Sequence, residues 1–204
     1  SWANAFTDLQ DALDARMSCA AIDTILIAEG TYYPTQSPDG TTTDARDRAF
    51  HLADSNVVIL GGYDASTSTP TGDTTFLSGD LLTAGTATDS AYHVFLTREL
   101  TSATSLENLV FTAGKANGSG QITYKARITA RYKSGGMNNY NSSFNMANCT
   151  FVNNSCSNFG GAMLNRRGSP TITNCLFLNN RGTQGGGMVN ESNSVPTLIN
   201  CRFF

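Results

Sequence analysis

The feature that most constrains this chain is a four-residue signature, Asn-Cys-x-Phe, that returns at a fixed interval near the C-terminus. Its copies begin at positions 148, 174 and 200, so they lie 26 residues apart without a gap. A fixed period of about 20 to 50 residues is typical of a solenoid, in which each repeat buries its apolar face only against its neighbours. Equivalent residues should then form ladders along the stack, namely Asn148, Cys149 and Phe151; Asn174, Cys175 and Phe177; Asn200, Cys201 and Phe203.

Two other segments recur in each repeat and indicate how one coil is built. A short β-rich run precedes each signature, and a glycine-rich stretch ending in methionine at position 137, 163 or 188 lies between signatures. This spacing predicts three short strands per coil and an all-β fold, the right-handed parallel β-helix, because parallel crossovers are almost always right-handed. Side chains alternate along a strand, so Cys175 and Phe177 should both point inward. Asn174 should occupy a corner, since asparagine tolerates left-handed backbone.

A leucine-rich-repeat solenoid is the main structural alternative. Cys175, Phe177 and Asn180 superficially fit its Leu-x-Leu-x-x-Asn pattern, and the period is compatible. The rest of the repeat has no leucine lattice and no helix-forming side, and a triple glycine at 185–187 lies opposite the signature strand. These differences favour the β-helix.

The first part of the chain predicts a short helix followed by irregular coils. Thr7 and Gln10 form a capping box, and apolar residues fall on one helical stripe. We expect the helix to cover the N-terminal edge of the solenoid and to block strand addition there. Short β-rich runs follow at 24–28, 49–52, 57–60, 75–77, 92–96 and 106–111. The residues of the apolar stripe are Phe6, Leu9, Leu13 and Met17.

We therefore expect a single β-helix domain over residues 1–204. Residues 1–114 form the cap and irregular coils, 115–134 a basic insertion, and 135–204 regular coils that we expect to continue beyond Phe204. Residues 1–114 hold 15 acids and four bases, a net charge of −11, whereas residues 115–204 hold nine bases and one acid, a net charge of +8. This division is either a property of the surface alone or a means of steering an acidic ligand or a head-to-tail contact.

Several segments resemble known proteins. Phe-x-x-Asn at 151–154 and 177–180, with Gly-Gly-Ala-Met at 160–163, resembles the repeats of bacterial polymorphic outer-membrane proteins. Segments 2–13, 27–34, 61–63, 77–80 and 92–94 resemble right-handed parallel β-helix proteins of bacterial surfaces, in the pectate-lyase-like superfamily. The resemblance covers nearly the whole chain except residues 115–134. It implies an extracellular or cell-surface location on the bacterial outer surface, an adhesin or passenger role, and a host or cell-surface ligand.

Catalysis is a functional alternative, because many parallel β-helices are polysaccharide lyases or hydrolases whose chemistry needs clustered carboxylates. Between positions 135 and 204 the only acidic residue is Glu191, so a two-carboxylate mechanism cannot be assembled there. We expect no catalytic residue and keep an enzyme acting on acidic glycans as the alternative. Five aspartates of the N-terminal part lie in turn-rich sequence, where aspartate is usually a turn former: Asp44, Asp47, Asp73, Asp80 and Asp89.

Neither the histidines nor the cysteines predict a metal or cofactor site. His51 and His93 lie in separate apolar runs, without a second ligand at metal spacing. Cys149, Cys175 and Cys201 share one position of the repeat, and a coil spacing of about 4.8 Å lies within disulfide range. Parallel side chains in register make the disulfide dihedral unfavourable, so we expect reduced cysteines that pack as small apolar side chains.

The segment 121–133 interrupts the repeat and alternates as an inserted strand or hairpin would. Its basic and aromatic side chains are candidates to bind an anionic glycan by charge and stacking, and nucleic acid is not the expected partner. The alternative is a solvated lateral strand that pairs with the acidic N-terminal region. The candidate ligand-binding residues are Tyr124, Lys125, Arg127, Arg131, Tyr132 and Lys133.

These features favour a non-catalytic secreted or cell-surface protein that displays a binding surface. No apolar run approaches the roughly 18 residues that a membrane-spanning helix needs. The alternative is a self-assembling filament subunit, in which the basic C-terminal coil of one copy contacts the acidic N-terminal end of the next.

Overall fold

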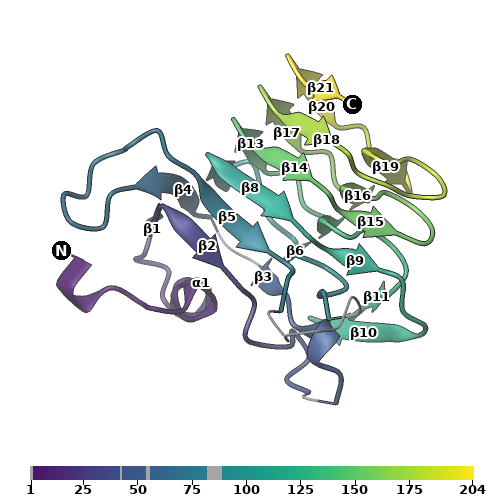
Figure 1. Cartoon of the computed structure of the whole chain (residues 1–204), viewed down its shortest axis with the longest axis horizontal. Coiled ribbons are helices and arrows are strands. Elements are labelled where there is room, and N and C mark those ends of the chain that lie inside the picture. Colours follow the sequence, from purple (N-terminus) through teal and green to yellow (C-terminus); the bar gives the residue numbers. More distant parts are fainter. Residues whose placement is uncertain (1, 42, 54–55, 82–88) are drawn as a thin grey trace.

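The computed structural model describes residues 2–41, 43–53, 56–81 and 89–204. Its strands stack into three parallel sheets (Figure 1). Sheet A contains β1 (Thr24–Ala28), β4 (Val58–Tyr63), β7 (Ser105–Glu107), β13 (Asn145–Ala147), β17 (Thr171–Thr173) and β20 (Thr197–Ile199). Sheet B contains β2 (Gly30–Tyr32), β5 (Thr75–Ser78), β8 (Leu109–Thr112), β14 (Thr150–Val152), β18 (Leu176–Leu178) and β21 (Arg202–Phe203). Sheet C contains β3 (Phe50–Ala53), β6 (Phe95–Arg98), β12 (Met137–Tyr140), β16 (Met163–Arg166) and β19 (Met188–Glu191).

Each regular coil passes through sheets A, B and C in turn, as the order β13, β14, β16 shows. Neighbouring coils pair in register, so that Phe151 lies beside Phe177 and Met163 beside Met188. The predicted right-handed parallel β-helix is confirmed. A leucine-rich repeat has one strand per repeat, so three sheets exclude that alternative.

The remaining elements lie outside these sheets. A 3-10 turn, η1 (Trp2–Asn4), precedes helix α1 (Leu9–Ser18), and η2 (Ala45–Asp47) precedes β3. Strands β9 (Lys115–Ala116) and β15 (Ser155–Cys156) form a short parallel pair at one corner. Strands β10 (Gln121–Tyr124) and β11 (Arg127–Ala130) form an antiparallel hairpin, so the inserted segment is a hairpin.

Single asparagines turn the chain from sheet A to sheet B. The φ angles of Asn148, Asn174 and Asn200 are 54°, 54° and 51°, in the left-handed region as predicted. The Nδ2 of Asn200 donates to Oδ1 of Asn174 at 2.8 Å, and the Nδ2 of Asn174 donates to Oδ1 of Asn148 at 3.4 Å. Asn108, with φ of 56°, makes the same turn. The single strand expected over 106–111 is therefore wrong, and this run divides into β7 and β8.

A stack of phenylalanines runs through the core beneath sheet B. The ring centroids lie 4.6 Å apart from Phe111 to Phe151, 5.1 Å from Phe151 to Phe177, and 4.4 Å from Phe177 to Phe203. The rings are nearly parallel, which is the geometry that equal positions on stacked coils impose. The predicted phenylalanine ladder is confirmed.

The signature cysteines form a second inward row. Cys149 and Cys175 are buried, and the thiol of Cys149 donates to the carbonyl oxygen of Ala147 at 3.3 Å. Burial raises the pKa of Cys149 well above its ordinary value, so this thiol stays protonated. The structure has all five cysteines as free thiols.

A polar row crosses the inner face of sheet C. The hydroxyl of Thr97 donates to Oδ1 of Asn139 at 2.8 Å, the Nδ2 of Asn139 donates to Oδ1 of Asn165 at 2.9 Å, and the Nδ2 of Asn165 donates to Oδ1 of Asn190 at 2.8 Å. The side chains of Thr97, Asn139 and Asn165 are buried. Each amide therefore finds its partner on the next coil, which removes the cost of burying it.

Helix α1 covers the N-terminal end of the core, as predicted, and Leu9 and Leu13 are buried there. The predicted capping box is wrong. The cap is Asp8, whose carboxylate accepts a hydrogen bond from the backbone N–H of Gln10 at 2.8 Å. Phe6 lies outside the helix and is 58% exposed.

The side chain of Gln10 has another role. Its Nε2 donates to the carbonyl oxygen of His51 at 3.1 Å, and its Oε1 accepts from the backbone N–H of His51 at 2.9 Å. The amide thus takes the place of a neighbouring strand beside β3. This contact closes the edge of sheet C against strand addition.

Candidate ligand-binding groove on sheet C

Strand alternation sends every second side chain of sheet C to the outer face. The register of β6, β12, β16 and β19 places Arg98, Tyr140, Arg166 and Glu191 side by side in one row across these strands. Neighbouring members of such a row are separated by the strand spacing of about 4.8 Å. The outer face of sheet C therefore carries a line of charged and aromatic groups.

The β10–β11 hairpin covers the N-terminal part of this face. Ile122 and Tyr124 of β10 are buried with Ala49, Ala53 and Leu96 in an apolar cluster separate from the main core. Alternation along β10 buries these two side chains while their neighbours remain exposed. The hairpin is thus packed on the solenoid along β3 and β6.

Two ion pairs hold the chain that follows β11. The Nε of Arg131 donates to Oδ1 of Asp47 at 2.7 Å, and Asp47 is fully buried. Burial raises the pKa of Asp47, although the hydrogen bond from Arg131 acts in the opposite direction. The Nζ of Lys133 lies 2.9 Å from Oε1 of Glu191. The Arg131 contact ties the hairpin to the acidic N-terminal region.

Arg98 lies beneath the hairpin and is only 1% exposed. Its Nη1 donates to the carbonyl oxygen of Thr97 at 3.0 Å and its Nη2 to the hydroxyl of Thr129. The guanidinium carbon lies 5.2 Å from the ring centroid of Tyr140 and 5.6 Å from that of Tyr124. Its Nε has no hydrogen-bond partner among the described residues.

No carboxylate of the described residues forms an ion pair with Arg98. Burial lowers the pKa of Arg98 to about 10, so the side chain still carries its charge at neutral pH. A buried charge without a partner of opposite sign is unfavourable, and aromatic rings offset only part of that cost. This position would be stabilised by an anion.

Three further arginines surround Tyr140. The guanidinium carbons of Arg127, Arg166 and Arg167 lie 5.4, 5.9 and 5.9 Å from its ring centroid. The Nη1 of Arg167 also donates to the hydroxyl of Tyr140 at 3.2 Å. Together with Arg98, four cations gather around one ring, which produces a concentrated positive potential.

A cavity of about 320 Å³ opens between β11 and the outer face of sheet C. We call this cavity the sheet C groove. Thr129 and Tyr140, two of the residues that contact the guanidinium of Arg98, are both part of its wall. The wall consists of Gln121, Ile128, Thr129, Ala130, Tyr132, Lys133, Asn138, Tyr140, Leu164, Arg166 and Glu191.

The structure gives different positions to the six candidate residues predicted from the sequence. Tyr132 and Lys133 line the groove, and Arg127 is exposed beside Tyr140. Lys125 is exposed at the tip of the hairpin. Tyr124 is buried and Arg131 is paired with Asp47, so these two hold the hairpin in place.

Four residues of this site were not predicted from the sequence. Arg98, Tyr140 and Arg166 each lie three residues after the first residue of a sheet C strand, and Arg167 directly follows Arg166. The signal was therefore present in the phase of the repeat. It was hidden because the residue type at this position changes from coil to coil.

The other titratable groups that the structure describes do not form a second site. His93 is buried, with its Nδ1 2.7 Å from the carbonyl oxygen of Ser134, and His51 packs edge-on against Tyr124 at 5.0 Å between ring centroids. Among the described residues, no three His, Cys, Asp or Glu side chains are grouped as a metal site requires. Asp44 caps η2 and accepts a hydrogen bond from the hydroxyl of Tyr92.

Three parallel sheets in register, one N-terminal helix and a buried aromatic stack define the chain as a parallel β-helix protein. Comparison with protein-family models, curated proteins and solved structures found no match. In the part of the chain that the structure describes, no helix has the length and apolar character needed to span a bilayer.

Proposed function

We propose that this protein is a non-catalytic, secreted or cell-surface β-helix of the adhesin or passenger kind, and that it binds an acidic glycan in the sheet C groove. The observation that carries the proposal is Arg98, a buried cation without a carboxylate partner beside the wall of the groove. An anionic ligand would supply the missing charge. A bacterial outer surface is the location that the proposal assumes.

The chemistry of the groove suits a carboxylated or sulfated sugar. Arginine forms paired hydrogen bonds with planar anionic groups. Arg127 and Arg166 are exposed beside Tyr140. Tyr132 is partly exposed in the wall and offers a ring face on which a sugar can stack.

A charge-matched pair of variants tests this proposal. Replacing Arg127, Arg166 and Arg167 with glutamine should weaken binding to heparin or alginate at least about tenfold, because three charge-assisted contacts are lost. Heparin presents sulfate groups and alginate presents carboxylates, so comparing the two shows which anionic group the site prefers. Neutral dextran is the control and should not bind. Binding is measured by isothermal titration calorimetry.

The control variant replaces three exposed arginines away from the groove, Arg48, Arg181 and Arg202, with glutamine. It removes the same charge and should bind as the unmodified protein does. Equal losses in both variants would mean that net charge alone attracts the glycan. No binding of either acidic glycan to the unmodified protein would refute the proposal.

A variant of Arg98 tests whether this residue has a binding role or a structural one. In Arg98→Met the buried charge is absent, so the free energy of unfolding should stay equal or rise, while glycan affinity should fall. A structural arginine would instead give a less stable protein with unchanged affinity. Thermal unfolding and calorimetry on the same samples make this comparison.

A polysaccharide lyase or hydrolase is the alternative of another class. The only acid in the wall of the groove is Glu191, which is paired with Lys133, so this alternative has less support. Release of products from a panel of acidic polysaccharides, with or without calcium, would favour the enzyme over the binding protein.

A filament subunit is the second alternative, supported by the opposite charges of the two parts of the chain. Helix α1 weighs against it, because this helix covers the end of the core and Gln10 closes the edge of β3. Rods that appear with rising concentration in electron micrographs and dissolve at high salt would favour the filament.

A further inference from the structure

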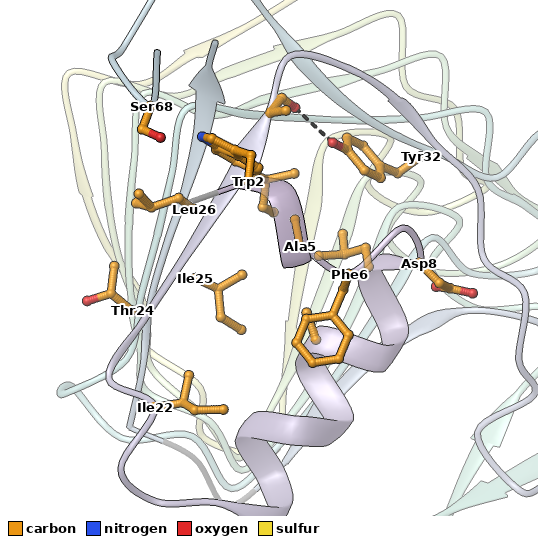
Figure 2. Close-up of a pocket in the computed structure, with 14 residues that line it drawn as sticks. Trp2, Ala5, Phe6, Asp8, Ile22, Thr24, Ile25, Leu26, Tyr32 and Ser68 are labelled. Atoms are coloured by element: carbon orange, nitrogen blue, oxygen red, sulfur yellow. Dashed lines mark hydrogen bonds between the residues drawn. The ribbon is translucent and has the colours of Figure 1, made fainter. Parts of the chain in front are cut away.

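A second cavity, of about 300 Å³, lies at the N-terminal end of the solenoid between β1 and the segment that leads into α1. Its wall includes every residue of β1 and is mostly apolar. Figure 2 shows Trp2, Phe6 and Ile25 around the same opening. We call this cavity the N-terminal pocket.

The pocket lies along an open strand edge. β1 is the first strand of sheet A, and within the described residues its only strand partner is β4. The carbonyl oxygen of Asp23 accepts from the backbone N–H of Val58, so this group faces β4. Backbone direction alternates along a strand, and the N–H and C=O groups of Thr24 and Leu26 therefore face the open edge.

The edge of sheet C at the same end is closed in a different way. Gln10 occupies the backbone groups of His51 on β3, and α1 packs against that strand. Among the described residues, no side chain makes a corresponding pair of hydrogen bonds with Thr24 or Leu26. One strand edge is thus capped, and a neighbouring edge is left open beside an apolar pocket.

Unpaired backbone groups indicate what kind of molecule fits. An edge strand offers a row of donors and acceptors that an extended peptide satisfies and an acyl chain leaves unpaired. In a β-strand every second side chain points the same way, so an added strand would place apolar side chains against Ile25 and Phe6. The pocket and the edge together therefore match a peptide.

The charges around the pocket indicate which residues should lie at the ends of that peptide. Asp23 precedes β1 and Glu29 follows it, and both are exposed, while Asp8 lies in the wall across from the strand. The wall contains no lysine or arginine. Basic residues at the ends of the peptide would complement these carboxylates.

We propose that the N-terminal pocket docks an extended segment of a partner protein, which adds as a strand to the open edge of β1. Every second residue of the segment is apolar and enters the pocket. The segment carries lysine or arginine at its ends. This interaction surface is separate from the sheet C groove, so one site can fail without the other.

A synthetic peptide of alternating valine and threonine with a lysine at each end is the probe. Trp2 lines the pocket and is the only tryptophan of the chain, so its fluorescence reports occupancy directly. The unmodified protein should bind this peptide saturably. Methylating the peptide nitrogens that face β1 should weaken binding about tenfold per lost hydrogen bond. A peptide that ends in glutamates should bind more weakly than the lysine peptide.

Two protein variants complete the test. Leu26→Pro removes an N–H from the open edge and keeps the face that pairs with β4, a position where proline is tolerated. It should lose peptide binding, with folding checked by circular dichroism. Phe6→Ala removes an exposed wall residue, should retain stability and should also bind less well. Three outcomes would each overturn the proposal. The methylated peptide could bind as well as the unmethylated one, dodecanoate could bind more tightly than the peptide, or the lysine peptide could fail to bind.

Discussion

At His93, burial decides the protonation state of a single side chain. The imidazole is buried, its Nδ1 is hydrogen-bonded to the carbonyl oxygen of Ser134, and its Nε2 has no partner among the described residues. Burial lowers the pKa of His93 to about 4 from an ordinary value of 6.5. The folded protein therefore holds this ring neutral over a range in which the unfolded chain protonates it.

This difference makes stability depend on pH. The stability that neutral His93 contributes is fully present above the unfolded pKa of 6.5. It is lost as pH falls toward the folded pKa of about 4. The total loss from this residue is about 3 kcal/mol, because one pKa unit corresponds to about 1.4 kcal/mol. Urea unfolding measured at intervals between about pH 7 and about pH 4 should show it.

His93→Asn is the matched variant, because the amide can keep the hydrogen bond to Ser134 and does not titrate. Its unfolding free energy should fall less over the same pH range, by about 3 kcal/mol. Parallel curves for the two proteins would show that the histidine contributes nothing to acid unfolding.

Among the elements, the β10–β11 hairpin has a strained turn. Its two turn residues, Lys125 and Ala126, have φ angles of 48° and 57°. A two-residue turn with both φ positive is the type I′ hairpin turn, which favours Asn-Gly because other residues pay a steric cost there.

Ala126→Gly should therefore raise the free energy of unfolding by about 1 kcal/mol. The control is Ala130→Gly, at a regular strand position in the same hairpin, which should lower it. Denaturant unfolding of both variants distinguishes relief of the turn from a general effect of glycine.

The elements also show where sequence reasoning succeeds. Cys175 and Phe177 point inward, and Asn174 turns a corner, because strand alternation and backbone preference are local properties that repeat in every coil. The break at Asn108 was missed, since one asparagine inside a β-rich run has no repeat signature around it. The cap is Asp8 and not Thr7. Both residue types are suitable caps, so the local sequence does not distinguish them.

The candidate site was less predictable than the fold. A basic hairpin was expected, yet nothing local distinguishes Arg131, which pairs with a buried aspartate, from Arg127, which remains exposed beside Tyr140. The position of Arg98 beneath the hairpin depends on how the insertion packs across sheet C. Such contacts join residues far apart in sequence and have no periodic signal.

At the scale of the whole molecule, α1 isolates the core from solvent at one end. Leu13 is fully buried at the centre of that contact. Leu13→Asp should detach the helix and expose the edge of β3 in addition to that of β1. Association that rises with concentration should therefore exceed that of the unmodified protein, because open edge strands pair with other chains.

Sedimentation velocity at several concentrations measures this association. Ser18→Asp adds the same charge at an exposed position of the helix and should associate no more than the unmodified protein. A monodisperse Leu13→Asp protein with native circular dichroism would show that the helix is not needed to protect this end.

Two of the asparagine rows of the solenoid have opposite polarity along the axis. In the inner row each amide donates toward the C-terminal coil, from Asn139 to Asn165 to Asn190. In the corner row each amide donates toward the N-terminal coil, from Asn200 to Asn174 to Asn148. The amide dipoles of the two rows therefore oppose each other along the axis. Each added coil lengthens both rows, so the contributions of these two rows to an axial electric moment remain opposed.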